Sequence, residues 1–116
     1  ELVDLITIDI TFASLRSVLP NIIHLLKKKG EIIALIKPIF EMEFHDLERF
    51  EIILDPDVLI ELLENLIEWC LNNRIYLKNI MKSPLLGKGG SVEFLAYFKL
   101  NENAKIDYMS KMKDII

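Results

Sequence analysis

Two short and almost uninterrupted apolar runs constrain this chain more than any other feature of its sequence. The first spans Leu2–Ile10, is rich in β-branched residues and is nearly all apolar after Asp4, and the second spans Glu31–Ile36. Continuous apolar runs of this length are typical of strands buried on both faces, as in a parallel sheet. Parallel neighbours need a crossover connection, which is usually a helix. We therefore expect an α/β fold.

The segment between the two runs has the periodicity of that helix. Apolar residues recur there at helical spacing, at Leu15, Val18, Leu19, Ile22, Ile23 and Leu26. Because proline is tolerated only in the first turn, the helix is predicted to begin near Ser17, with Pro20 in that turn. Lys27–Lys29 then complement the dipole in the last turn, and Gly30 ends the helix. A basic patch is the alternative interpretation of the three lysines.

The rest of the chain adds one helix and two strands. Ile39–Leu54 is irregular and is expected to be a loop with one helical turn. Asp55-Pro56 starts a long amphipathic helix, since Asp is a good N-cap and proline suits the first helical position. Ile75–Lys82 and Ser91–Leu100 are predicted strands, and their short connection makes the fourth strand antiparallel to the others. The tail from residue 101 to 116 is expected to be a loosely held extension.

Composition narrows the class of protein. With 116 residues, of which 52% are hydrophobic, the chain is one globular domain and not a disordered segment. Its net charge of −4 argues against a free-standing nucleic-acid binder. The single cysteine, Cys70, excludes a disulfide framework, and with no paired histidines at ligand spacing no metal site is predicted. No apolar run approaches the roughly 18 residues of a membrane span and no signal peptide is recognisable, so we expect a cytoplasmic location.

Three charged residues fall at one edge of the predicted sheet. Asp9 lies near the end of the first strand, Lys37 closes the second, and Glu93 lies near the start of the antiparallel fourth. Ligands of open α/β sheets bind beyond the carboxyl ends of the strands. If strands one, two and four are neighbours in that order, about 4.8 Å apart, a carboxylate flanks the Lys37 ammonium on each side. The alternative is that these charges only mark the strand ends.

Four stretches of sequence occur in a characteristic order over residues 2–100. They are Asp9-Ile-Thr-Phe-Ala-Ser-Leu15, Leu35-Ile-Lys-Pro-Ile-Phe-Glu41, Asp55-Pro56 and Ser83-Pro-Leu-Leu-Gly-Lys-Gly-Gly-Ser-Val-Glu-Phe-Leu95. Together they resemble the hemolysin A (TlyA) family, whose methyltransferase domain is of the FtsJ type. The resemblance implies the later half of a Rossmann-like class I methyltransferase fold at residues 1–100, with residues 101–116 as an extension. It also implies S-adenosylmethionine-dependent 2′-O-methylation of RNA, most often ribosomal RNA.

The resemblance further implies a set of site residues. FtsJ-type enzymes use a Lys-Asp-Lys-Glu tetrad, whose Asp, second Lys and Glu fall on Asp9, Lys37 and Glu93. A ribose hydroxyl is a poor nucleophile that must be positioned and relieved of its proton. Lys37 is therefore either a general base or the group that orients this hydroxyl. Asp9, Ile10 and Phe12 are the expected contacts to the cofactor.

The sequence departs from the family pattern in what it lacks. The first tetrad lysine, the Gly-rich cofactor loop and the RNA-binding domain all belong upstream of Glu1, which indicates a fragment. We therefore expect the chain to be inactive alone, to meet RNA through the full-length protein, and to self-associate through the unpaired edge of its first strand. A non-catalytic α/β interaction module is the first alternative. A membrane-active hemolysin is the second, although the polar face of the long helix is acidic rather than basic.

Overall fold

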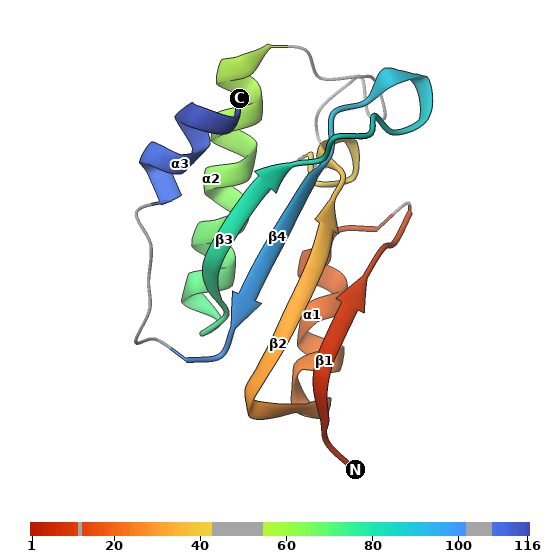
Figure 1. The fold of residues 1–116 in the computed structure, drawn as a ribbon, viewed down its shortest axis with the longest axis vertical. Helices are drawn as coiled ribbons and strands as arrows, with labels where there is room; N and C mark the ends of the chain where they lie inside the picture. Colours follow the sequence, from red (N-terminus) through yellow and green to blue (C-terminus); the bar gives the residue numbers. More distant parts are fainter. Residues whose placement is uncertain (12, 43–54, 102–107) are drawn as a thin grey trace.

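The chain folds into a four-stranded mixed sheet, shown in Figure 1 as a computed structural model that describes residues 1–11, 13–42, 55–101 and 108–116. The strands are β1 (Val3–Ile8), β2 (Leu26–Ile36), β3 (Tyr76–Lys82) and β4 (Phe94–Lys99), in the order β1-β2-β4-β3. β1 pairs with β2 in parallel, and β4 runs antiparallel to β2 and to β3. The predicted direction of the fourth strand and the predicted adjacency of strands one, two and four are confirmed.

Three helices cover one face of this sheet (Figure 1). They are α1 (Leu15–Ile22), α2 (Pro56–Asn72) and α3 (Tyr108–Ile115). Buried side chains of these helices share one core with alternate residues of β2 and β4, namely Leu15, Leu19, Leu63, Leu66, Met112, Ile32, Ala34, Ile36, Phe94, Ala96 and Phe98. A burial period of two residues is what a strand shows when one of its faces is covered.

The opposite face of the sheet is open in the described part of the chain. Leu5 of β1 is 50% exposed and Ile33 of β2 is 40% exposed, and both point away from the helices. The expectation that the first two strands are buried on both faces is therefore wrong. Their apolar runs would suit a doubly covered sheet, but the described helices all gather on the other side.

The first helix differs from its prediction at both ends. It begins at Leu15 because Ser14 is the N-cap, its Oγ accepting the Arg16 N–H at 3.0 Å. Pro20 thus lies inside the helix and not in its first turn, and the helix ends at Ile22. Since proline offers no N–H to the preceding turn, it favours this early end. A single 3-10 turn, η1 (Ile23–Leu25), leads directly into β2.

The three lysines and Gly30 belong to β2 and not to a helix end. The pairing steps from Val3–Leu26 to Leu5–Glu31, so β2 advances by five residues while β1 advances by two. The extra residues make an irregularity of the β-bulge kind, which sequence periodicity did not reveal. Within it, Lys27 pairs with Asp4 at 3.0 Å.

The second half of the chain follows the prediction closely. Asp55 caps α2 by accepting the Asp57 N–H at 2.9 Å, and Pro56 takes the first helical position.

None of the described helices has the length and apolar character needed to cross a membrane. Of the irregular segment, the 3-10 turn η2 (Pro38–Phe40) is described, while the prediction for residues 43–54 lies outside the described residues.

The last element corrects the expectation of a loosely held tail. Met112 of α3 is fully buried in the core, where α3 contacts both α2 and β3. The helical pattern in the tail was weak because its described polar residues outnumber the few that pack inward. The division of the chain at residue 100 stays a prediction.

Candidate active site

Lys37 and Asp9 form an ion pair at one edge of the sheet. The Lys37 Nζ lies 2.8 Å from Asp9 Oδ1 and also donates to Thr11 Oγ1 at 3.4 Å. The lysine side chain is only 17% exposed, whereas that of Asp9 is 69% exposed. The ammonium is thus held at a fixed place, and the carboxylate remains open to solvent.

The two strands place this pair by their direction. β1 and β2 are parallel neighbours, with Ile8 paired to Ala34 near their carboxyl ends. Asp9 follows Ile8 directly, and Lys37 follows the last residue of β2. Carboxyl ends of adjacent parallel strands meet at one edge of a sheet, which is where open α/β sheets bind ligands.

Glu93 lies at the same edge but is not joined to Lys37. β4 begins at Phe94, which pairs with Ile36, so one further step of the register sets Glu93 opposite Lys37. Its carboxylate instead packs against Gly87, where an added Cβ would lie 2.4 Å from Glu93 Oε2. The Glu93 carbonyl also accepts the Ser83 N–H at 2.8 Å, which closes the loop between β3 and β4. The structure therefore unites two of the three predicted residues and leaves the third beside them.

The two remaining candidates are Ile10 and Phe12, which follow β1 in the sequence. Ile10 is half-buried against the core. Phe12 lies outside the described residues. Of the expected cofactor contacts, Asp9 is the one whose polar group is described and accessible.

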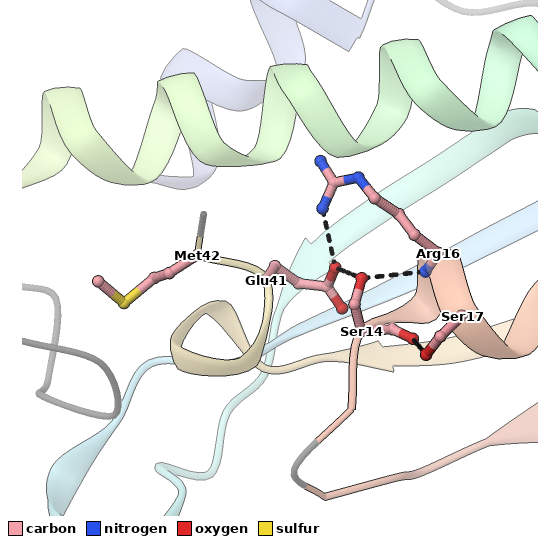
Figure 2. A pocket seen from close by; sticks show the side chains of 5 residues that line it. All are labelled: Ser14, Arg16, Ser17, Glu41 and Met42. Carbon is pink, nitrogen blue, oxygen red and sulfur yellow. Dashed lines mark hydrogen bonds and ion pairs between the residues drawn. The ribbon is translucent and has the colours of Figure 1, made fainter. Parts of the chain in front are cut away.

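Glu41 forms a second polar cluster beside the ion pair, which Figure 2 shows in close view. Its Oε1 accepts hydrogen bonds from the Ser14 hydroxyl and, at 3.2 Å, from Arg16 Nη1. Its Oε2 accepts the Leu15 N–H at 2.8 Å. One carboxylate thus satisfies the donors of three successive residues where α1 begins, a favourable place for a negative charge.

This carboxylate is buried, and burial shapes its titration. The side chain of Glu41 is 3% exposed. Burial raises the pKa of Glu41 above its ordinary value, while the hydrogen bonds from Ser14 and Leu15 and the charge of Arg16 act in the opposite direction. An open depression of about 310 Å³ lies over the cluster, lined by Ser14, Arg16, Ser17, Glu41 and Met42 (Figure 2).

Cys70 is a core residue and not a nucleophile. Its side chain is fully buried in α2, and burial raises the pKa of its thiol to about 12, with a smaller contribution from the negative Glu41. Thiol chemistry needs the thiolate, which such an environment disfavours. The prediction of a packing role for Cys70 agrees with this burial.

Two further features concern possible metal ligands and a polar contact on the open face of the sheet. Among the described residues, no three His, Cys, Asp or Glu side chains gather as metal ligands. On the open face of the sheet, Tyr97 donates its hydroxyl to Glu31, which raises the pKa of Tyr97. Neither feature adds a reactive group to the site.

The sequence prediction missed Glu41, Arg16 and Thr11. Glu41 was visible within the Leu35–Glu41 stretch, but nothing in the local pattern indicates that it reaches back to residues 14–16. Thr11 falls two residues after Asp9, outside the regular strand, so no periodicity assigns its direction. Both belong to contacts between distant segments, which a single sequence does not reveal.

Comparison with known proteins gives these features a context. A family model described as "FtsJ-like methyltransferase" matches residues 1–100. The chain is 34% identical over 91 residues to "Putative rRNA methyltransferase YqxC" of Bacillus subtilis, covering 78% of this chain and 32% of that protein. It is 32% identical over 98 residues to "Hemolysin A" of Brachyspira hyodysenteriae, covering 84% of this chain and 41% of that protein.

Solved structures show the same relationship. One titled "The crystal structure of a putative hemolysin from Lactococcus lactis" matches with a TM-score of 0.84 and 31% identity, over 97% of this chain and 53% of that one. Another, "Putative hemolysin from Streptococcus thermophilus", matches with a TM-score of 0.85 and 26% identity, over 97% and 40%. The chain therefore spans a third to a half of the length of these relatives.

Proposed function

Because the chain belongs to the FtsJ-like methyltransferase family, we propose that it carries the hydroxyl-positioning half of an S-adenosylmethionine-dependent RNA 2′-O-methyltransferase. The observation that carries the proposal is the ion pair between Lys37 and Asp9 at the carboxyl edge of the sheet. Ribosomal RNA is the proposed substrate, in keeping with the name of the Bacillus subtilis relative, and the proposed place of action is the cytoplasm.

Methyl transfer to RNA requires that the ribose 2′-hydroxyl be held in a fixed position. Bound S-adenosylmethionine would supply the methyl group to the ribose 2′-oxygen and leave as the thioether, and the hydroxyl proton would pass to water. Methyl transfer needs the oxygen in line with the carbon, and fixing such geometry contributes a large share of a rate enhancement. A group at a fixed place that donates to the oxygen serves this need.

Lys37 suits the orienting role better than that of a general base. An ammonium has three donors and no acceptor, and the Asp9 carboxylate at 2.8 Å stabilises this charged form. With one donor directed to Asp9 and one to Thr11, a third remains for the ribose 2′-oxygen. In this role Lys37 touches the reacting oxygen and leaves the proton to another acceptor.

Asp9 and Glu93 support this lysine in different ways. Asp9 already holds the ammonium and, being largely exposed, keeps an oxygen free for a ligand hydroxyl. Glu93 lies opposite Lys37 in the register, and a rotation of its side chain away from Gly87 would bring a second carboxylate toward the ammonium. In this proposal all three residues would surround one point when substrate is bound.

The residues present fit one side of a cofactor site. S-adenosylmethionine supplies an electrophilic methyl group on a sulfonium when it is bound. Asp9 and Ile10 would contact it at the end of β1, offering a carboxylate for its polar groups and an apolar surface. The described glycines all lie in β2 or between β3 and β4, so none follows β1 to permit a close backbone approach. We therefore propose that the 116 residues alone do not methylate RNA.

The relatives' names favour one second candidate, a hemolysin. Membrane-surface helices usually carry basic residues on their polar face. The exposed polar residues of α2 include Glu61 and its face contains no lysine or arginine. We therefore rank methyl transfer first, and a non-catalytic interaction module remains the outcome in which neither activity is found.

The chemistry of the product tests the proposal. The full-length protein that contains this chain is incubated with labelled S-adenosylmethionine and ribosomal RNA, and the RNA is then hydrolysed with alkali. A 2′-O-methyl group blocks attack of that oxygen on the neighbouring phosphate, so label is expected in alkali-resistant dinucleotides. The isolated chain is assayed in parallel and is expected to transfer nothing.

Three results would contradict parts of this account. Label recovered in mononucleotides would indicate base methylation and overturn the 2′-O assignment. Absence of transfer by the full-length protein would favour the interaction module, and leakage of lipid vesicles at the same concentration would favour the hemolysin. Transfer by the isolated chain would show that its cofactor site is complete.

A further inference from the structure

The Lys37–Asp9 pair is open to water on its Asp9 side, although the Lys37 side chain is only 17% exposed. Asp9 is 69% exposed and lies in the irregular segment after β1. Ion pairs this open to water contribute little, because solvent screens the attraction and the side chains lose freedom. Thr11, the other partner of Lys37, is also exposed. Something else must keep this segment against the lysine.

Glu41 can hold this segment against the lysine, because the turn after β2 joins it to Lys37. The turn η2 connects it rigidly to Lys37, with Phe40 N–H donating to the Lys37 carbonyl and Glu41 N–H to the Pro38 carbonyl, both at 2.9 Å. Pro38 is buried and fixes its own backbone. One hydrogen-bonded turn therefore links the backbone of Lys37 to that of Glu41.

The same carboxylate also binds the start of α1, on the other side of the Lys37 site. It accepts hydrogen bonds from Ser14, Leu15 and Arg16 at the start of α1 (Figure 2). Ser14 lies three residues after Thr11 in the sequence. Ser14 in turn caps α1 through the Arg16 N–H. The segment is thus anchored at one end by β1 and at the other by Glu41.

Burial makes this anchor stronger than the exposed pair. Glu41 is 3% exposed, and its two oxygens accept three hydrogen bonds, two of them from side chains at the start of α1. Charge-assisted hydrogen bonds away from water are stronger than exposed ones, and breaking them leaves an unsatisfied buried group. A polar cluster of this kind specifies one arrangement of the segments that it joins.

We propose that Glu41 is a positioning residue that holds the Asp9–Thr11 segment against Lys37 by tying the turn after β2 to the start of α1. The proposal rests on the proposed function for the role of Lys37 in methyl transfer. Its test does not depend on that function. Without this tie, Asp9 and Thr11 separate from the ammonium more often, and the lysine becomes accessible.

The test measures the accessibility of Lys37 and needs no methyl transfer. The chain is treated briefly with acetic acid N-hydroxysuccinimide ester, and acetylation of each lysine is followed by mass spectrometry. Glu41→Gln keeps the shape of the side chain but removes its charge. This variant is expected to raise the acetylation rate of Lys37 by about twofold to fivefold. That factor corresponds to the free energy that an exposed ion pair contributes. Asp9→Asn should give a similar rise, and Glu61→Gln, on the exposed side of α2, should give none.

Two internal reporters separate positioning from general loosening. Lys82 is exposed at the same edge and is acetylated in the same reaction. Cys70 is fully buried, so its thiol, followed separately by alkylation with iodoacetamide, reacts only when the core opens. A rise at Lys37 with unchanged rates at Lys82 and Cys70 supports the proposal. An unchanged rate at Lys37 overturns it, as does a rise at Lys37 and Cys70 in equal proportion.

A second variant covers the case in which Glu41→Gln does not fold. Ser14→Ala removes one partner of the carboxylate at a half-buried position and leaves the core untouched. It is expected to raise the Lys37 rate in the same direction by a smaller factor, and no rise in a folded variant overturns the proposal. None of these rate measurements involves RNA. A failure of the positioning proposal is therefore distinguishable from a failure of the proposed methyl transfer.

Discussion

At the scale of single residues, the site consists of two carboxylates with opposite surroundings. Asp9 is open to water and is proposed to meet ligands, whereas Glu41 is buried and holds backbone and side chains in place. Sequence reasoning found Asp9 because a charge at the end of an apolar run is conspicuous. It missed Glu41 because the donors that surround it come from residues 14–16, which no local pattern connects to position 41.

The burial of Glu41 predicts a dependence of stability on pH. Its pKa is raised in the folded state, so the folded chain binds this proton more tightly than the unfolded chain, where the value is about 4.5. The free energy of unfolding must therefore fall as pH rises from below 4.5 through the raised pKa. Urea denaturation of the wild type and of Glu41→Gln over this range measures the effect.

The comparison between the two proteins isolates Glu41 from other titrating groups. The difference in unfolding free energy, wild type minus variant, is expected to be largest in acid and to decrease toward neutral pH. A difference that stays constant, or that increases with pH, would contradict the raised pKa.

At the scale of elements, the two halves of the chain differ in how well the sequence predicted them. The start of α2 was predicted to the residue because Asp55 and Pro56 are strong local signals. β2 was predicted to begin at Glu31 but begins at Leu26, because the irregularity at Lys27–Gly30 depends on its pairing with β1. The Asp-Pro signal thus predicts the start of α2 from the local sequence, whereas the single Ser14 cap of α1 and the strand pairing of β2 are not recognised from local patterns.

Gly30 provides the test at this scale. An added Cβ would lie 2.4 Å from Leu26 Cδ1 and 2.9 Å from the backbone oxygen of Lys27, and the backbone cannot give way as a side-chain tip can. Gly30→Ala is therefore expected to lower the unfolding free energy by about 1–3 kcal/mol, the usual cost of overpacking. Urea denaturation measures it, with Lys28→Ala in the same exposed stretch as the control expected to change little. An unchanged midpoint for Gly30→Ala would show that the irregularity is not needed.

At the scale of the whole molecule, the sheet has one covered face and an edge strand with exposed apolar residues. β1 lies at the end of the strand order, and Leu2, Val3 and Leu5 are each 41–50% exposed. The unpaired edge expected from the sequence is thus present among the described strands. A long edge of this kind is a template for pairing with another chain.

Self-association through this edge is the prediction at the molecular scale. The isolated chain is expected to associate as its concentration rises, and Leu5→Lys is expected to weaken this, because charged side chains on an edge strand oppose pairing. Sedimentation velocity over a range of concentrations measures both. Ile33→Lys on the interior strand β2, the same kind of change at a 40% exposed apolar residue, is the matched control. Equal association of wild type and Leu5→Lys would exclude β1 as the contact.

The central claim is that the Lys37 ammonium, held by Asp9, positions the hydroxyl that receives the methyl group. Its most direct test is the rate of methyl transfer to ribosomal RNA by the full-length protein carrying Lys37→Ala, compared with Lys82→Ala at the same edge of the sheet. Lys82 is exposed, and Lys37→Ala removes one ion pair to the largely exposed Asp9, a loss of about 1 kcal/mol, so both variants are expected to fold. The account predicts a loss of about 10²-fold or more for Lys37→Ala and a near-normal rate for Lys82→Ala. A wild-type rate in a folded Lys37→Ala protein would contradict it.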